Sequence, residues 1–375
     1  MEQYNILGRI GEGAHGIVLK AKHIESGDLV ALKKVPLRKL AEGIPNTALR
    51  EIKALQSVES SPYVVRLREM FPHGTGFVLV FDYMHTDLSE VIRNSGSPLT
   101  DSQIKSYMVM ILSGVEVMHR NGIMHRDLKP ANLLISSTGL LKIADFGLAR
   151  VFRNNSERLY SHQVATRWYR APELLYGARK YTNSVDLWAV GCIFGEMLNS
   201  SPLFPGENDI EQLWFVIRVL GTPKEDNWPE LKDLPDYNKI TFNLCEPTPF
   251  EEIFPDASSE AVDLIKQFLV YPPYGRISVG KALLHDYFTT EPLPAHSSEL
   301  PHPNPHRTGF AAMVHPQQAY ESCLTASMGS LLVGHDLLRE GALLSVFADG
   351  KRQSASPVPC ASPTQIAVPL SNTDK

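Results

Sequence analysis

The chain has 375 residues, of which 43% are hydrophobic and 21% are charged, and its formal net charge is -5 at pH 7. This length exceeds one typical domain of about 100 to 200 residues and predicts two lobes with a further segment. The small negative charge argues against bulk attraction to nucleic acid or to an anionic membrane, so we expect no nucleic-acid partner.

Cysteine spacing and the apolar segments favour an intracellular protein. The cysteines are Cys192, Cys245, Cys323 and Cys360, and none forms a CxxC pair that would suggest zinc or a redox couple. The first residues show no basic and then apolar leader, which predicts no secretory signal. The most apolar helical stretch, 187–195, is shorter than the ~20 residues that a bilayer span requires. We therefore expect an intracellular location, in the nucleus and the cytoplasm, and no membrane span.

The first part of the chain, residues 4–81, is predicted to be a small β-rich lobe interrupted by one helix. Runs of β-branched and apolar residues between glycine-containing turns indicate the strands. The helix start is marked by Pro45-Asn46-Thr47, and Ala48, Ile52 and Leu55 then form an apolar stripe at i, i+4 and i+7. The predicted strands are 4–10, 17–23, 29–35, 63–71 and 77–81.

From about residue 88 to residue 288 the pattern is helical, which predicts a larger second lobe and an α+β fold. The stretch 221–255 has many Pro, Asn and Asp residues and little periodicity, so we expect a surface insert. Residues 291–375 hold 10 of the 27 prolines, and this composition predicts a largely disordered tail over 289–375. The clearest predicted helices are 104–119, 185–198, 210–220 and 261–269.

Three glycines between two predicted strands, in a GxGxxGxV pattern over 11–18, indicate a loop whose backbone amides approach phosphate oxygens. A dinucleotide-binding loop would continue into a helix, whereas the β-branched Ile17-Val18 favours a strand. By itself the pattern would also fit a flexible hairpin. The nucleotide contacts expected from this loop are Ile10, Gly11, Glu12, Gly13, Ala14, His15, Gly16, Ile17 and Val18.

Lys33 and Glu51 are expected to form an ion pair that positions the lysine. Strand periodicity places Ala31 and Lys33 on one face, where Ala31 and Val18 would enclose an adenine ring and Lys33 would contact the phosphates. Glu51 lies on the inward stripe of the predicted helix, and an inward charge requires a partner. The alternatives are an exposed strand lysine and a carboxylate at the edge of the helix stripe.

A compound motif in the second lobe places an acid, a lysine, an amide and a second acid at the spacings that phosphoryl transfer to a protein needs. It consists of HRDLKPAN at 125–132 and DFG at 145–147. We expect Asp127 to accept or orient the proton of the attacking hydroxyl, and Lys129 to neutralise charge on the phosphoryl group. Asn132 and Asp145 are expected to hold Mg²⁺, which prefers oxygen ligands. A polar loop capped by Asp127 is the structural alternative.

Together these motifs resemble the eukaryotic protein kinase family over residues 4–288. PNTALRE at 45–51 and ATRWYRAPE at 165–173 resemble the signature helix and the substrate-side segment of cyclin-dependent kinases. Ala-Pro-Glu at 171–173 closes a segment that begins at Asp145, and Glu173 is expected to pair with Arg276. The resemblance implies a bilobal kinase fold, with an N-lobe, a hinge, a C-lobe and an activation segment at 4–81, 82–87, 88–288 and 145–173.

The resemblance also implies the activity, an ATP- and Mg²⁺-dependent transfer of phosphate to protein Ser or Thr that precedes proline, in cell-cycle or growth control. Thr166 would then support Asp127 and Lys129 in catalysis, while Val164 and Arg170 would shape the pocket for that proline. The implied hinge contacts to the nucleotide are Phe81, Asp82, Tyr83, Met84 and Asp87.

Regulation follows from the same resemblance. It implies a cyclin or cyclin-like activator, and an activating phosphate on Ser161 that an upstream kinase or self-phosphorylation supplies. Arg50, Arg126 and Arg150 could bind this phosphate, because three acceptor oxygens match guanidinium donors. The alternative is three unrelated surface arginines. Ala14-His15 stands where cell-cycle members carry Thr-Tyr, so inhibitory phosphorylation at these two positions is chemically impossible.

Two other functions are weighed against an active protein kinase. A catalytically weak pseudokinase that serves as an interaction scaffold would share the fold. Intact Lys33, Asp127 and Asp145 argue against it. A small-molecule kinase is disfavoured by the full activation segment, which seats a polypeptide substrate.

Overall fold

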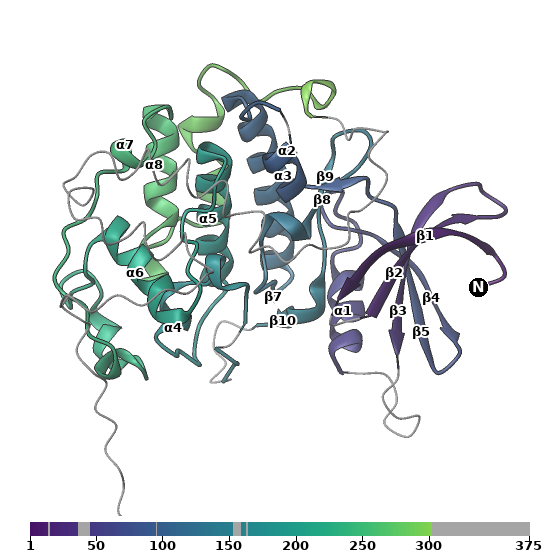
Figure 1. Cartoon of the computed structure of the whole chain (residues 1–375), viewed down its shortest axis with the longest axis horizontal. Coiled ribbons are helices and arrows are strands. Elements are labelled where there is room, and N and C mark those ends of the chain that lie inside the picture. Colours follow the sequence, from purple (N-terminus) through teal and green to yellow (C-terminus); the bar gives the residue numbers. More distant parts are fainter. Residues whose placement is uncertain (14–15, 37–45, 95, 153–158, 163, 302–375) are drawn as a thin grey trace, which may run out of the picture.

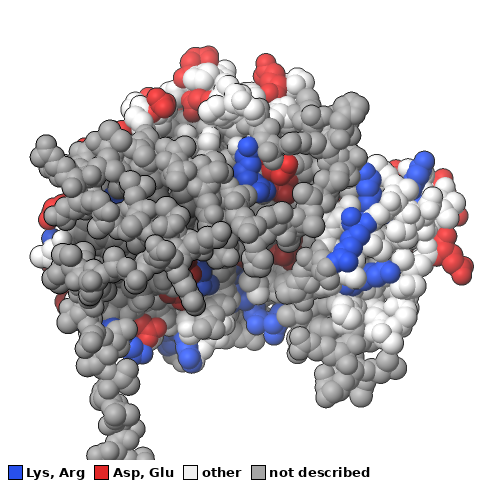
Figure 2. Space-filling view, in the orientation of Figure 1, with Lys and Arg blue, Asp and Glu red and all other residues white. Residues whose placement is uncertain are grey.

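The computed structural model describes residues 1–13, 16–36, 46–94, 96–152, 159–162 and 164–301. A β-sheet with one helix forms the small lobe, and helices form most of the larger lobe beside it (Figure 1). The predicted bilobal α+β fold is therefore confirmed. Side chains of both charge signs lie on each lobe in Figure 2.

The small lobe is built on an antiparallel sheet with strand order β1-β2-β3-β5-β4. Because strand side chains alternate between faces, Val30 and Leu32 of the central strand are buried in a small apolar cluster, while Ala31 and Lys33 lie on the other face. The strands are β1 (Tyr4–Gly13), β2 (Gly16–His23), β3 (Leu29–Pro36), β4 (Leu67–His73) and β5 (Gly76–Asp82).

The strand predicted at 63–71 was wrong at its start, because β4 begins only at Leu67. Val65 donates its N–H to the carbonyl of Ile143 at 2.9 Å, and the N–H of Ile143 bonds the carbonyl of Tyr63 at 2.8 Å. These residues therefore pair with the large lobe and not with the sheet. Sequence periodicity cannot distinguish these two partners for the same apolar run.

Helix α1 (Asn46–Ser57) contacts β4 of the sheet and the short helix η3 (Phe146–Leu148). Its predicted apolar stripe is confirmed, since Ala48, Ile52 and Leu55 are buried. Glu51 lies on the same stripe and is also buried. The helix therefore carries one charged side chain toward the space between the lobes.

The large lobe packs around α5 (Ser184–Asn199), an almost entirely buried helix that contacts α3 (Asp101–Arg120) and α8 (Ser259–Phe268). Thr100 and Gln103 form a reciprocal capping box at the start of α3. The remaining α-helices are α2 (Leu88–Asn94), α4 (Pro172–Leu175), α6 (Asp209–Leu220), α7 (Phe250–Ile253) and α9 (Val279–Leu283).

Short strands at the junction of the lobes carry the catalytic motifs. β8 pairs with β9 and β6, and β10 pairs with β7. They are β6 (Thr86–Asp87), β7 (Ile123–Met124), β8 (Leu133–Ile135), β9 (Leu141–Ile143) and β10 (Arg150–Val151). The 3-10 helices are η2 (Pro130–Asn132), η3 (Phe146–Leu148), η4 (Arg167–Tyr169), η5 (Pro229–Asp233), η6 (Tyr237–Lys239), η7 (Pro273–Gly275), η8 (Asp286–Phe288) and η9 (Ser297–Glu299).

The stretch 221–255 is more than the predicted surface insert. Trp228 is buried, and its ring stacks on Tyr271 at 5.6 Å and meets Tyr176 edge-on at 6.1 Å. Leu231 is buried beside it. A few large apolar side chains therefore anchor a segment that lacks helical periodicity.

The predicted start of the disordered tail needs a correction, because residues 289–301 lie against α3. The ammonium group of Lys105 donates to the carbonyls of Thr290 at 2.9 Å and Pro292 at 2.8 Å. The hydroxyl of Ser106 donates to the carbonyl of Ala295 at 2.6 Å, and Leu300 is buried. The rest of the predicted tail, 302–375, lies outside the described residues. Within the described ranges, no helix is both long and apolar enough to cross a membrane.

Candidate active site

Three predicted catalytic residues meet at the loop between β7 and β8, and they are Asp127 and Lys129 of the loop and Thr166 of the activation segment. Asn132, a predicted metal ligand, lies beside them. One carboxylate oxygen of Asp127 accepts hydrogen bonds from the backbone N–H of Thr166 at 2.9 Å and from its hydroxyl at 3.1 Å. The other oxygen accepts from the amide of Asn132 at 3.2 Å and lies 3.1 Å from the ammonium group of Lys129. Lys129 also donates to the Thr166 hydroxyl at 2.9 Å. The Asp127 carboxylate is thereby held in one orientation.

Asp186 on α5 fixes the backbone of this loop. Its carboxylate accepts the backbone N–H groups of His125 and Arg126 at 2.9 and 2.8 Å, and it lies 2.9 Å from Nε2 of His119. Burial alone would raise the pKa of Asp186, yet the hydrogen bonds from His119 and the Arg126 backbone hold it below its ordinary value. Arg126 has a φ of 68°, a strained conformation that such contacts maintain.

The role of Asp186 was not predicted from the sequence, although one signal was available. It is an acidic residue in the first turn of a helix whose following residues are almost all apolar. A charge that is buried in this way requires partners. The sequence does not show which partners, because they lie about 60 residues away in the chain.

Lys33, Glu51 and Asp145 meet between the lobes, as the sequence motifs predicted. The ammonium nitrogen of Lys33 lies 2.6 Å from a carboxylate oxygen of Glu51 and 3.6 Å from one of Asp145. Burial alone would lower the pKa of Lys33, but the two carboxylates raise it above its ordinary value. The lysine therefore stays charged, with its end directed toward the DFG segment.

The DFG segment is held by packing on both sides. Asp145 has a φ of 61° and precedes η3, which lies against α1. The rings of His125 and Phe146 meet edge-on with centroids 5.0 Å apart, and Nε2 of His125 lies 3.0 Å from the carbonyl oxygen of Ala144. These contacts give His125 and Phe146 a packing role beside the catalytic residues. Asp145 is consequently directed into the space between the lobes.

The residues predicted to line the nucleotide site lie mainly on β1, β2, β3 and β5. Ala31 pairs with Lys20 on one side and with Phe81 on the other, and Val18 pairs with Lys33. Gly16 begins β2 with a φ of 123°, and a Cβ atom there would lie 1.9 Å from the carbonyl oxygen of Lys34. Only glycine fits this turn. Ile10, Gly11 and Ile17 lie in β1 and β2, whereas Ala14 and His15 fall outside the described residues, and only the backbone of Glu12 and Gly13 is described.

Two predicted hinge contacts already have structural partners. The carboxylate of Asp82 accepts from Arg68 at 2.6 Å and from Lys142 at 3.4 Å, which ties β5 to both β4 and β9. The carboxylate of Asp87 accepts from the Ser89 hydroxyl and from a backbone N–H of α2, and burial raises its pKa. Both side chains stabilise the hinge. Tyr83 and Met84, of which Met84 is buried, lie with His85 in the segment between β5 and β6.

The predicted substrate pocket is formed around a strained backbone. Arg170 donates from Nε to the carbonyl of Val164 at 2.9 Å and from Nη2 to the carbonyl of Ala165 at 3.0 Å. Ala165 has a φ of 63°, which is unusual for a residue other than glycine. The sequence prediction named Val164 and Arg170 but missed Ala165, because an alanine carries no sequence signal for this conformation.

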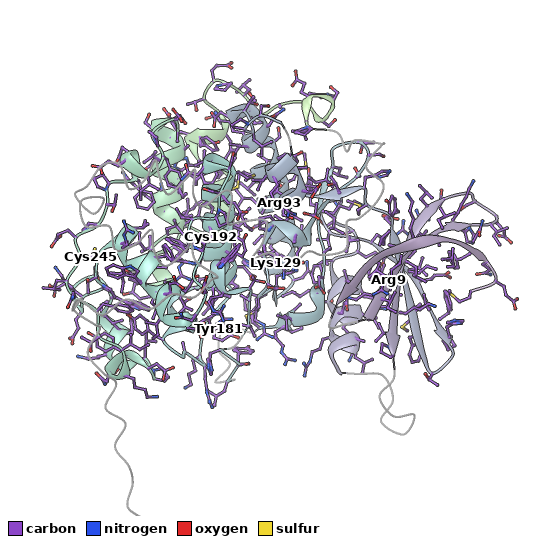
Figure 3. The ribbon with its side chains drawn as sticks, viewed as in Figure 1. Arg9, Arg93, Lys129, Tyr181, Cys192 and Cys245 are labelled. Atoms are coloured by element: carbon purple, nitrogen blue, oxygen red, sulfur yellow. The ribbon has the colours of Figure 1, made fainter. Side chains whose placement is uncertain are left out.

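Arg126, one of the three predicted phosphate-binding arginines, is connected to Ser161 through Tyr181. Its Nη1 donates to the Tyr181 hydroxyl at 2.8 Å, and that hydroxyl donates to the Ser161 carbonyl at 2.7 Å. The Ser161 side chain is exposed. Arg150 lies on β10, which contacts α1, the helix that carries Arg50 on its exposed face. Figure 3 labels Tyr181 in this region and Lys129 in the catalytic loop.

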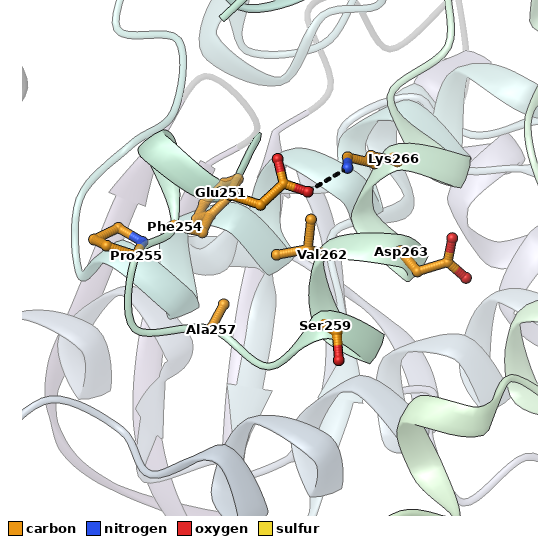
Figure 4. Close-up of a pocket in the computed structure, with 8 residues that line it drawn as sticks. All are labelled: Glu251, Phe254, Pro255, Ala257, Ser259, Val262, Asp263 and Lys266. Atoms are coloured by element: carbon orange, nitrogen blue, oxygen red, sulfur yellow. Dashed lines mark hydrogen bonds and ion pairs between the residues drawn. The ribbon is translucent and has the colours of Figure 1, made fainter. Parts of the chain in front are cut away.

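A separate pocket of about 360 Å³ lies between α7 and α8 (Figure 4). These helices lie at the end of the large lobe that is remote from the sheet (Figure 1). An ion pair between Glu251 and Lys266, 2.7 Å apart, borders it. None of the predicted active-site residues lines this pocket. Its lining residues are Glu251, Phe254, Pro255, Ala257, Ser259, Val262, Asp263 and Lys266.

Comparison with known proteins identifies the family to which this geometry belongs. The family model described as "Protein kinase domain" matches residues 4–288. The chain belongs to the protein kinase family. Cyclin-dependent kinase 20 of Danio rerio is 67% identical over 343 residues, which covers 92% of this chain and 99% of that protein. The Homo sapiens protein of the same name is 65% identical over 316 residues, which covers 84% of this chain and 91% of that protein.

Two further matches are more distant in sequence. Cyclin-dependent kinase D-1 of Arabidopsis thaliana is 45% identical over 78% of this chain and 73% of that protein. A solved structure of the CAK complex of Chaetomium thermophilum bound to ATP-γ-S aligns with a TM-score of 0.75 and 34% identity, over 80% of this chain and 96% of that one. The chain is thus a cyclin-dependent protein kinase, and the resemblance of its motifs to those of cyclin-dependent kinases is confirmed.

Proposed function

We propose that this kinase transfers the γ-phosphoryl group of ATP to Ser or Thr residues that precede proline in protein substrates. The observation that supports the proline preference is the left-handed backbone conformation of Ala165. Its carbonyl is bonded to Arg170 at 3.0 Å, so it is not directed at a substrate as an acceptor. A substrate residue with a backbone N–H would leave that donor unsatisfied here, whereas proline has no N–H to lose.

The residues of the catalytic loop support the transfer step. A substrate hydroxyl next to Asp127 would give its proton to, or be oriented by, a carboxylate that Thr166 and Asn132 hold in place. Lys129, 2.9 Å from the Thr166 hydroxyl, would offset the charge of the phosphoryl group. Lys33, fixed by Glu51, would contact the α- and β-phosphates. ATP as the donor is supported by membership of the kinase family and by the ATP-γ-S that is bound in the similar CAK complex.

A magnesium ion fits the donor set between the lobes. The nitrogen of the Asn132 amide donates to the backbone carbonyl of Asp127 at 2.8 Å, which leaves the amide oxygen as a ligand atom. The side chain of Asp145 is 38% exposed toward the same space. Oxygen ligands of this kind suit Mg²⁺, which would neutralise phosphate charge when bound. Asn132 and Asp145 are the residues that would hold it.

A peptide assay tests this proposal. With labelled ATP and Mg²⁺, wild type should phosphorylate a Ser-Pro peptide about 5- to 150-fold faster than the matched Ser-Ala peptide, since one unsatisfied buried donor costs about 1–3 kcal/mol. Asp145→Asn and removal of Mg²⁺ should each reduce incorporation to near background. Equal background signals from wild type and Asp145→Asn, with an activator present, would favour the scaffold alternative. Equal rates on the two peptides would contradict the proline preference.

An activating phosphate on Ser161 is proposed on the basis of its neighbours. Ser161 is exposed, and Arg126 reaches its backbone through the Tyr181 hydroxyl. We expect Ser161→Ala to lower kcat by about tenfold or more, because a phosphate at this point would add charge-assisted hydrogen bonds that order the segment. The measurement is turnover on the Ser-Pro peptide after treatment with an activating kinase. Tyr160→Phe serves as a control one residue away, and equal turnover of Ser161→Ala and wild type would exclude this role.

A cyclin or cyclin-like protein is the proposed activator. The family supports this partner, and the surface of α1 offers it an apolar contact. Leu49 on α1 is 37% exposed and Val151 on β10 is 55% exposed, and the two elements contact each other. Replacement of Leu49 by a charged residue should therefore weaken binding of the activator, as measured by titration. Unchanged binding would exclude this surface. The intracellular location stays a prediction.

A further inference from the structure

Asp209, the first residue of α6, joins two arginines of the substrate-side segment. Its carboxylate oxygen Oδ1 lies 2.9 Å from Nε of Arg167 and 3.0 Å from Nη1 of Arg170. Two backbone carbonyls just before Asp209 bind the same segment. The Glu207 carbonyl accepts a hydrogen bond from Arg167 at 2.8 Å, and the Gly206 carbonyl accepts one from the indole N–H of Trp168 at 3.1 Å. The loop before α6 is thus fastened to the segment that would seat a substrate.

The contact with Arg170 bears directly on the strained backbone. The side chain of Arg170 is only 13% exposed, and its guanidinium group uses its other donors to hold the carbonyls of Val164 and Ala165. An alanine at a φ of 63° persists only where surrounding contacts over-determine it. Asp209 is the charged group that binds Nη1 of this guanidinium, while Nε and Nη2 bind the two carbonyls. Without it, Arg170 would be free to turn, and the Ala165 carbonyl would be free to rotate back toward a substrate.

We propose that Asp209 is a positioning residue for substrate selection, which holds Arg170 in the orientation that keeps the Ala165 carbonyl away from the residue after the phosphorylated Ser or Thr. This inference rests on the proposed preference for proline. It assigns Asp209 no contact with substrate and no part in the transfer itself. Loss of its charge should therefore relax selection among substrates more than it lowers turnover.

The test compares the selectivity of Asp209→Asn with that of wild type. The ratio of kcat/KM for a Ser-Pro peptide to that for a Ser-Ala peptide should fall by about tenfold, which corresponds to about 1.4 kcal/mol, because a released Ala165 carbonyl could accept the backbone N–H of the Ser-Ala peptide. The change should come mainly from faster reaction of the Ser-Ala peptide. Glu207→Gln removes a carboxylate two residues away in the same turn and should leave the ratio as in wild type.

The possible outcomes separate this inference from the proposal on which it rests. A wild type with a Ser-Pro preference that Asp209→Asn retains would overturn the positioning role alone. An equal fall in kcat/KM for both peptides would also overturn it, because a merely structural role reduces activity without changing selection. A wild type that does not distinguish the two peptides would overturn the proline preference and the positioning role together.

Discussion

Asp127→Asn is expected to lower kcat for phosphoryl transfer by about 10²- to 10⁴-fold, the range for loss of a positioned proton acceptor. Asparagine has nearly the same shape, so the contacts with Thr166 and Lys129 can persist in part. What disappears is the negative charge that attracts the proton of the substrate hydroxyl. KM for the peptide should change little, because the lost interaction belongs to the transition state. Steady-state kinetics on a Ser-Pro peptide measures both constants.

A matched variant separates chemistry from folding. Asp233→Asn makes the same substitution at an exposed residue of η5 and should leave kcat unchanged. Both variants should melt within a few degrees of wild type. If Asp127→Asn retained a tenth or more of wild-type kcat at a saturating peptide concentration, Asp127 would not be the proton acceptor.

Much of the site could be predicted because local periodicity and motif spacing determine it. Strand alternation directs Lys33 to the cleft face, and the helix stripe directs Glu51 inward, which together predict that the two pair. In the structure the charged groups lie 2.6 Å apart. Asp127 and Asn132 are five residues apart in one short loop that ends in η2, so their proximity follows from the loop itself. Such features depend on neighbours within a few residues. The roles of these residues in catalysis remain predictions.

Other features depend on contacts that are distant in the chain, and the sequence could not specify them. The conformation of Ala165 depends on Arg170 and, through it, on Asp209. The catalytic loop depends on Asp186, about 60 residues further along. Residues 289–301 have a composition typical of disorder, yet the buried Lys105 binds two of their carbonyls, at Thr290 and Pro292. Composition measures the average tendency of a segment, whereas one buried donor can order it.

Arg276→Met is expected to lower the free energy of unfolding by about 3–5 kcal/mol, the cost of breaking a buried ion pair by removal of one partner. The predicted pair is confirmed, since two nitrogens of Arg276 lie 2.8 and 2.6 Å from the carboxylate oxygens of Glu173. Neither side chain is more than 3% exposed. Arg276 also donates to the carbonyls of Ser184 and Tyr271, so it connects the end of the activation segment to α5. Thermal melting should show a decrease in Tm of roughly 10 °C.

An exposed ion pair in the same lobe provides the comparison. Lys266→Met breaks the pair between Lys266 and Glu251, whose side chains are 43% and 64% exposed, and should cost at most about 1 kcal/mol. The difference arises because water replaces the partner of Glu251 but cannot reach Glu173. Replacing Glu173 by Leu together with Arg276→Met should therefore recover part of the lost stability, since no uncompensated charge remains buried. Equal losses of stability from Arg276→Met and Lys266→Met would show that burial does not control the strength of this pair.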